Sequence, residues 1–133
     1  VDSLHEEMLL GPAMSIPRLL GRNRLGFDDI DAWELHEAFA TQVLINRRCM
    51  ASAAFVSERL GSGLPHGEIP LERLNAWGGS LSLGNPFAAT GVRLLLTAAQ
   101  RLQASGERYA VVSTCAGGGL GAALLLENPG GAT

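Results

Sequence analysis

The chain has 133 residues, 47% of them hydrophobic and 17% charged, with a formal net charge of −3. This length and composition predict one globular domain with a sizeable core, and because no basic run is present we expect no nucleic-acid partner. Two cysteines do not make a disulfide scaffold, no apolar run approaches the ~20 residues of a transmembrane helix, and no secretory signal pattern is present, so we expect a reducing, cytoplasmic location.

The first predicted element is an amphipathic helix that begins at Gly11, with apolar residues at positions 13, 16, 19 and 20. We expect Gly21 and Gly26 to end it. An acidic turn over residues 27–31 then leads into a short strand over residues 32–35. The apolar face of the helix indicates a packing role.

A second helical pattern begins at His36 and continues to Gly61, with apolar residues recurring at steps of three and four. This places His36 where a strand gives way to a helix, and α/β sheets bind ligands beyond the carboxyl ends of their strands. Two interpretations stay open: a histidine held by structural hydrogen bonds, or one that faces a ligand. Cys49, in the middle of the pattern, is predicted to pack in the core.

A glycine-rich stretch over residues 77–91 follows a loop and a short predicted strand over residues 75–77. It runs through Asn85 and Pro86 into a helix predicted over residues 87–104. We expect Pro86 at the first helical position and Asn85 as the N-cap. A helix N-terminus can also hold a phosphate or a developing oxyanion, so Asn85 has both a structural and a functional interpretation.

The last predicted elements are two apolar strands, over residues 109–114 and 122–127, joined by a glycine turn. Such a turn favours an antiparallel hairpin, because some of its positions need positive φ. The elements together predict an α/β fold: a mixed sheet with helices on both faces and a C-terminal β-hairpin.

Three strand ends carry chemically useful residues. If the strands lie in one sheet with right-handed crossovers, they are parallel and their carboxyl ends share an edge. That edge would hold His36, Asn85 and Cys115 beside the backbone N–H groups of residues 117–119. A proton carrier next to preorganised donors is what acyl-transfer chemistry requires. The three predicted parallel strands end at Leu35, Trp77 and Thr114.

The residues at these three places resemble the C-terminal half of the thiolases, the coenzyme A-dependent 3-ketoacyl-CoA acyltransferases. Residues 36–40 (HEAFA) resemble the motif (N/H)-E-A-F-A, in the His-first form that is similar to β subunits of fatty-acid β-oxidation complexes. Residues 77–91 resemble G-G-x-x-x-x-G-H-P-x-x-x-x-G, and residues 115–121 resemble C-x-G-G-G-x-G. The resemblance extends over residues 11–127 and implies a C-terminal thiolase-like domain comprising residues 1–133.

The resemblance implies a catalytic role for each matching residue. Cys115 would move the proton at the α-carbon in Claisen condensation or its reverse. The amide N–H of Gly117 would form one oxyanion hole with the amide of the acyl-accepting cysteine. His36 would hold a water that forms the other oxyanion hole with the residue at position 85.

Coenzyme A is implied as a co-substrate, with Ala38 and Phe39 along its pantetheine arm, and no tightly bound cofactor or metal is expected. The implied partners are acyl-CoA and either further copies of the chain in a homo-oligomer or the α subunit of a β-oxidation complex.

Two departures from the family pattern matter. The acyl-accepting cysteine belongs to an N-terminal half, no residue here matches its motif, and Cys49 does not replace it. The segment, which opens on Val1, is therefore predicted to be inactive alone and to be part of a longer chain. The second departure is Asn85, which stands where the family has histidine. Its NH2 group can donate a hydrogen bond, but it has no nitrogen that could take a proton from a thiol.

The leading hypothesis is thus the C-terminal domain of an acyltransferase that cleaves or forms 3-ketoacyl-CoA, impaired by Asn85. A second hypothesis is a non-condensing domain that binds acyl-CoA or supports a partner subunit. A third is a related condensing enzyme that works with asparagine at this position.

Overall fold

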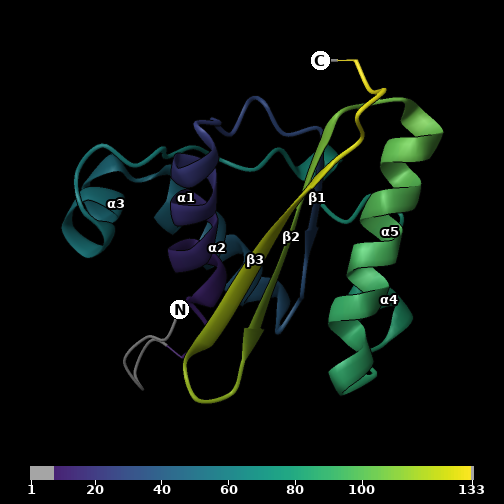
Figure 1. The fold of residues 1–133 in the computed structure, drawn as a ribbon. Coiled ribbons are helices and arrows are strands. Elements are labelled where there is room, and N and C mark those ends of the chain that lie inside the picture. Colours follow the sequence, from purple (N-terminus) through teal and green to yellow (C-terminus); the bar gives the residue numbers. More distant parts are fainter. Residues whose placement is uncertain (1–7, 133) are drawn as a thin grey trace.

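A computed structural model describes residues 8–132 of the chain. Its centre is a three-stranded sheet with the order β1-β2-β3, formed by β1 (Ala32–Leu35), β2 (Tyr109–Ala116) and β3 (Leu120–Glu127). Helix α1 (Gly11–Asn23) packs on one face and α5 (Thr90–Ser105) on the other, as Figure 1 shows. The predicted α/β fold with helices on both faces of the sheet is confirmed.

The sheet is mixed. β1 pairs in parallel with β2, with Leu35 opposite Ser113, whereas β2 and β3 form an antiparallel hairpin in which Cys115 lies opposite Gly121. The glycine turn between them contains Gly118 and Gly119 at φ of 91° and 80°, a conformation that favours glycine. The predicted C-terminal hairpin is therefore present, with β2 longer at its end than the sequence pattern indicated.

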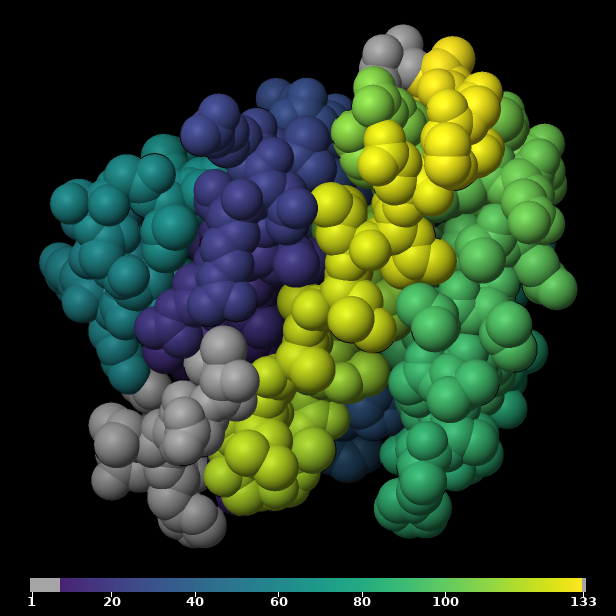
Figure 2. All heavy atoms as spheres, viewed as in Figure 1, coloured from purple at the N-terminus to yellow at the C-terminus, as the bar shows by residue number. Residues whose placement is uncertain are grey.

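Alternation along the strands divides the core into two clusters, because successive side chains of a strand point to opposite faces. The α1 face contains Trp33, Leu35 and Val111, and the α5 face contains Ala110 and Val112. β1 and β2 are buried on both faces, as is typical of a parallel pair covered by helices. The third strand, β3, forms a band between α1 and α5 at the molecular surface (Figure 2).

Helix α1 begins at Gly11 as predicted but continues past Gly21 to Asn23. Arg24 ends it in the left-handed conformation, and its backbone N–H bonds the carbonyl groups of Gly21 and Leu20. Gly11 itself packs on Gly121 of β3 so closely that a Cβ on Gly11 would lie 2.7 Å from the Cα of Gly121. This contact holds the turn end of the hairpin against the start of α1.

The single helix predicted from His36 to Gly61 is wrong. The structure has two helices there, α2 (Ala40–Ala51) and α3 (Ala53–Leu60), and residues 36–39 are not helical. Ser52 separates the two because it is extended and its Oγ accepts a hydrogen bond from the N–H of Phe55 at 3.2 Å, which caps α3. Cys49 is half-buried and packs against the α1-side core.

The strand predicted over residues 75–77 is absent. After the short helix η2 (Leu71–Arg73), Leu74 makes one parallel bridge to Trp33, and Asn75 then turns the chain away at φ 46°. The Asn75 side chain replaces the missing strand: its Oδ1 accepts from the N–H of Leu35 at 2.8 Å and its Nδ2 donates to the Leu35 carbonyl at 2.9 Å. The end of β1 is thus closed by an amide side chain.

The helix predicted over residues 87–104 is present from Thr90 onward as α5, whose N-cap is Ala89, and its first three predicted residues form the short helix η3 (Phe87–Ala89). A further short helix, α4 (Ser80–Leu83), precedes them. The prediction that Asn85 caps α5 is therefore wrong. No helix of the described residues is both long and apolar enough to cross a membrane.

Candidate functional site

A cavity of about 540 Å³ opens where β1 and β2 end. Residues from all three thiolase-like stretches, 36–40, 77–91 and 115–121, line it. Its lining residues are Leu9, His36, Ala38, Asn85, Phe87, Ala88, Thr90, Gly91, Thr114, Cys115, Ala116 and Gly117. The structure therefore brings His36, Asn85, Cys115 and Gly117 to one place, although only two of the three strands expected to carry them exist.

His36 follows directly on β1 and is held on two sides. Its N–H donates to the Ser113 carbonyl of β2 at 2.9 Å, and its Nδ1 lies 2.8 Å from Oγ of Ser80, the first residue of α4. Burial lowers the pKa of His36 below its ordinary value, and the nearby Arg93 guanidinium lowers it further, against the opposing charge of Glu37. The ring is therefore neutral at pH 7.

The Glu37 side chain links the residues that follow β1 to the first turn of α4. Its Oε2 accepts a hydrogen bond from the N–H of Leu81 in the first turn of α4 at 2.9 Å. The same carboxylate lies so close to Gly79 that a Cβ there would overlap it. The glutamate of the HEAFA stretch thus ties the two motifs together, with the negative charge at a helix start where it is favourable.

The orientation of the Asn85 side-chain amide is decided by its partners. Its Oδ1 accepts from the backbone N–H of Phe87 at 3.1 Å and from the Thr90 hydroxyl at 2.7 Å. A backbone N–H can only donate, so the atom facing it is the oxygen and the other is the NH2 group. Asn85 lines the cavity, and it can act toward a ligand there as a hydrogen-bond donor that does not titrate.

Cys115 lies on β2, one residue beyond the predicted strand end, and is 8% exposed. Burial raises the pKa of its thiol, which outweighs a backbone hydrogen bond that lowers it. The group is therefore a protonated thiol at neutral pH, suited to giving a proton to a carbanion. Gly117, two residues on, is exposed, and a Cβ built on it would meet no atom within 4 Å. Open space thus adjoins its backbone.

Of the two residues expected along a pantetheine arm, Ala38 lines the cavity, whereas Phe39 is 72% exposed and outside the lining. Phe87 is an apolar rim residue that the sequence did not single out: it is 86% exposed at φ 48°, a conformation that is uncommon for an aromatic residue. Within residues 8–132, no group of three His, Cys, Asp or Glu side chains could hold a metal ion.

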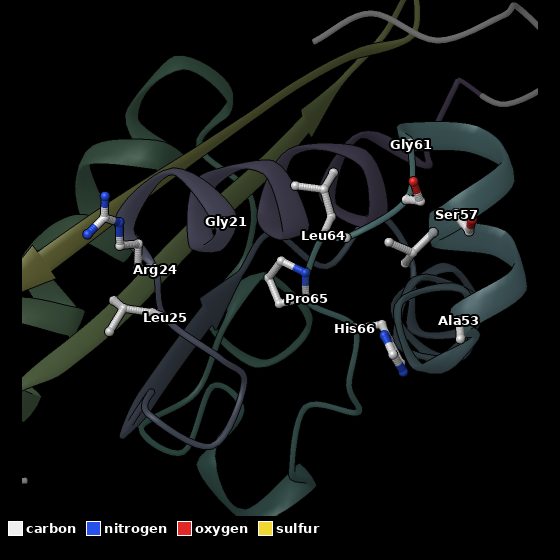
Figure 3. Close-up of a pocket in the computed structure, with 12 residues that line it drawn as sticks. Gly21, Arg24, Leu25, Ala53, Ser57, Gly61, Leu64, Pro65 and His66 are labelled. Carbon is white, nitrogen blue, oxygen red and sulfur yellow. The ribbon is translucent and has the colours of Figure 1, made fainter.

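A second cavity, of about 550 Å³, lies between α1, α3 and the loop that follows α3. Its ionisable lining residues are Arg24 and His66, which Figure 3 shows on opposite sides of Pro65. They do not converge on a common point, and no residue of the three motifs lines this cavity. The candidate site is therefore the cavity at the ends of β1 and β2.

Comparison with known families decides which protein class carries this arrangement. Residues 1–128 match the family model described as "Thiolase, C-terminal domain". The chain belongs to the thiolase family.

Two relatives are similar to almost the whole chain. It is 48% identical over 122 residues to the mitochondrial trifunctional enzyme subunit beta of Mus musculus, covering 92% of the chain and 26% of that protein. It is 47% identical to a probable 3-ketoacyl-CoA thiolase of Caenorhabditis elegans, covering 92% of the chain and 27% of that protein. The chain thus spans about a quarter of the length of these relatives.

A solved thiolase structure has the same fold. The structure of human mitochondrial 3-ketoacyl-CoA thiolase in complex with CoA superimposes with a TM-score of 0.80 at 28% identity, covering 96% of this chain and 28% of that one. The fold and family expected from the three motifs are confirmed, whereas the roles of the individual site residues stay predictions.

Sequence reasoning missed the side chains behind the site. Ser80, Arg93 and Thr90 hold His36 and Asn85, and Asn75 closes β1. Thr90 and Ser80 lie inside the thiolase-like stretch 77–91, and membership of that motif is the only local feature that could have indicated a role at the site. Arg93 lies beyond that stretch, on a helix whose pattern indicated packing alone.

Proposed function

We propose that this thiolase domain supplies part of a site that cleaves or forms 3-ketoacyl-CoA with coenzyme A and acetyl-CoA by Claisen chemistry. The observation that carries the proposal is the single cavity lined by Cys115, His36, Asn85 and Gly117. Similarity to proteins named as 3-ketoacyl-CoA thiolases supports this substrate class.

The proposed cleavage separates the bond between the α- and β-carbons of a 3-ketoacyl thioester. The acyl group passes to the thiolate of a cysteine of the N-terminal half, and the electron pair of the broken bond stays on the α-carbon of the acetyl-CoA enolate. The Cys115 thiol gives its proton to that carbon and becomes a thiolate. In the second step the coenzyme A thiol gives its proton to Cys115, and its sulfur takes the acyl group from the cysteine, which leaves as a thiolate. The reverse sequence gives condensation. The raised pKa of Cys115 keeps the proton available at neutral pH.

Two neutral donors suit the thioester oxygen on which the enolate charge develops. His36, through the water that it is predicted to hold, and the Asn85 NH2 group would donate hydrogen bonds to this oxygen from the cavity that both residues line. Preorganised donors of this kind contribute ~10²–10³ in rate per donor. The Gly117 N–H is assigned to the other oxyanion hole, together with the amide of the acyl-accepting cysteine. No tightly bound cofactor is required by this scheme, in which coenzyme A is a substrate.

Asn85 supports a second candidate, a domain that binds acyl-CoA or supports a partner without condensing. The two N–H groups of its amide can donate hydrogen bonds to a ligand, whereas its oxygen accepts from Thr90 and Phe87. The amide has no basic nitrogen and so cannot accept a thiol proton. Loss of general-base assistance lowers a rate by ~10²–10⁴. The third candidate is a condensing enzyme that works with asparagine at position 85, and for it we expect normal thiolysis by the wild-type protein.

Thiolysis of acetoacetyl-CoA separates these candidates. The assay uses the polypeptide that contains this chain together with a thiolase N-terminal half, as wild type and as Asn85→His. Low wild-type activity that rises ~10²-fold or more in Asn85→His supports an impaired acyltransferase. Normal wild-type turnover contradicts impairment and favours the third candidate. Retained acyl-CoA binding with no turnover in either protein favours the binding domain.

We also propose that the chain is the C-terminal part of a longer polypeptide. An apolar groove of about 260 Å³ between α5 and β3 supports this, with Val92 and Leu124 59% and 54% exposed on its walls.

Assembly into a homo-oligomer or with an α subunit stays a proposal, supported by relatives named as trifunctional enzyme subunit beta. A cytoplasmic location also stays a proposal, and those relatives are named as mitochondrial.

A further inference from the structure

Two polar side chains, those of Ser80 and Arg93, form a chain of hydrogen bonds that ends at His36 Nδ1. Ser80 is buried, and its Oγ lies 2.8 Å from His36 Nδ1. Arg93 of α5 reaches the same oxygen with Nη2 at 3.4 Å, while its Nη1 donates to the Gly84 carbonyl at 2.8 Å. The three side chains come from the end of β1, from α4 and from α5.

The direction of these hydrogen bonds follows from the donors available. A guanidinium has only donors, so Ser80 Oγ accepts from Arg93. The Ser80 hydroxyl hydrogen then needs an acceptor, and within residues 8–132 the one its Oγ meets is His36 Nδ1. Nδ1 therefore accepts a hydrogen bond. In a neutral imidazole the other nitrogen, Nε2, must then carry the proton.

The charges around the ring favour this neutral form. Burial and the positive charge of Arg93 both lower the pKa of His36, while Glu37 raises it. The Glu37 carboxylate is occupied by the N–H of Leu81, and Cys115, which faces the same cavity from β2, is an uncharged thiol. Both ring nitrogens of an imidazolium would donate, which would leave the Ser80 hydroxyl without its acceptor.

We propose that Ser80 and Arg93 are positioning residues that fix His36 as the neutral Nε2–H tautomer, so that it offers a hydrogen-bond donor, and not a base, to the cavity. The inference rests on the proposed function and deepens it. His36 and Asn85 then form a matched pair of neutral N–H donors. A thioester carbonyl oxygen that gains negative charge is the ligand chemistry that such a pair fits.

The test is ¹⁵N NMR of histidine-labelled protein, using the polypeptide that contains this chain with a thiolase N-terminal half. The His36 signal is assigned by its loss in His36→Ala. We expect the wild type at pH 7 to show a protonated Nε2 and an unprotonated Nδ1. Ser80→Ala should give a mixture of tautomers, and Arg93→Gln should raise the pKa of His36.

Ser82→Ala is the matched control, because Ser82 lies in the same short helix and, within residues 8–132, the hydrogen bonds of its Oγ are to the backbone of Gly79. It should leave the tautomer and the titration of His36 unchanged. If thiolysis is measurable, Ser80→Ala should lower kcat by up to ~10²-fold, as for a misdirected oxyanion donor. Ser80→Thr, which keeps the hydroxyl, should restore the tautomer.

A protonated Nδ1 in the wild type would overturn the proposal, and so would an unchanged tautomer in Ser80→Ala. If Ser80→Ala fails to fold, the wild-type spectrum and the Arg93→Gln titration still decide the question. Because the spectrum does not depend on turnover, an Nε2–H tautomer in a protein without thiolase activity would contradict the proposed function alone.

Discussion

Replacing Arg101 by methionine should strongly destabilise the domain, because it leaves a buried carboxylate without its cation. Arg101 Nη1 donates to Glu34 Oε1 at 2.6 Å, and the Glu34 side chain is fully buried while that of Arg101 is 10% exposed. The same guanidinium donates to the carbonyl groups of Trp33 at 3.3 Å and Arg73 at 3.0 Å. Arg101 thus connects α5 to β1 and to the end of η2.

The expected loss is about 3–5 kcal/mol of unfolding free energy, the usual result of removing one partner of a buried ion pair. Burial already raises the pKa of Glu34 although Arg101 opposes it, and without Arg101 the pKa rises further. A carboxyl group with a raised folded pKa favours folding below its unfolded pKa, and this contribution is lost as pH rises through the folded pKa. Arg101→Met should therefore cost less at low pH than at pH 7.

Urea unfolding of the 133-residue chain measures this loss, with the fluorescence of buried Trp33 as the signal in a Trp77→Phe background. The matched control is Arg108→Met, which removes a surface ion pair to Glu127 of 2.9 Å and should cost little, because solvent-exposed ion pairs contribute little to stability. Adding Glu34→Gln to Arg101→Met should recover part of the loss, because the buried charge is gone. If Arg101→Met costs no more than Arg108→Met, the buried pair does not support the fold as argued.

Three further outcomes are expected. Cys115→Ala should abolish condensation and α-proton exchange in the complete thiolase, whereas retained exchange of the α-proton, followed by NMR in deuterated water, would remove Cys115 from the acid-base role. Asn75→Ala should destabilise the domain by about 2–4 kcal/mol in urea unfolding, because the buried N–H and carbonyl of Leu35 both lose a partner, and a loss below about 1 kcal/mol would contradict this. Thr90→Val removes one of the two donors to Asn85 Oδ1 and should weaken acyl-CoA binding in calorimetry, whereas Thr90→Ser should bind as the wild type does.

The elements that the sequence predicted well are those whose signal is local. The apolar faces of α1 and α5 repeat within a few residues, and the β2-β3 hairpin has its glycine turn between two apolar runs. The three motifs also indicated the family, because their residue types and spacing can be read from the sequence without knowing which residues are in contact. They placed Cys115, His36, Asn85 and Gly117 in one cavity correctly.

The predictions that failed had a competing interaction that the local pattern did not show. A strand was expected over residues 75–77, but Asn75 adopts a positive φ, and its side-chain amide hydrogen-bonds to the backbone of Leu35, 40 residues away. Asn85 was expected to cap a helix, but Thr90 and Phe87 direct its oxygen elsewhere. Ser52 interrupted the helix predicted after His36 because its hydroxyl caps α3.

The sequence by itself thus determined which chemical groups this thiolase domain possesses: a thiol, an imidazole, a glycine-rich turn, and an amide in place of the family histidine. Only the tertiary structure decided the state in which they are presented. The hydrogen bond from Ser80 to His36 joins residues 44 apart in sequence, and Arg93 reaches Ser80 across 13 residues. These partners set the tautomer and charge of His36, whereas the orientation of the Asn85 amide is set by Phe87 and Thr90, two and five residues away. Each property depends on which donor faces which acceptor in the folded chain.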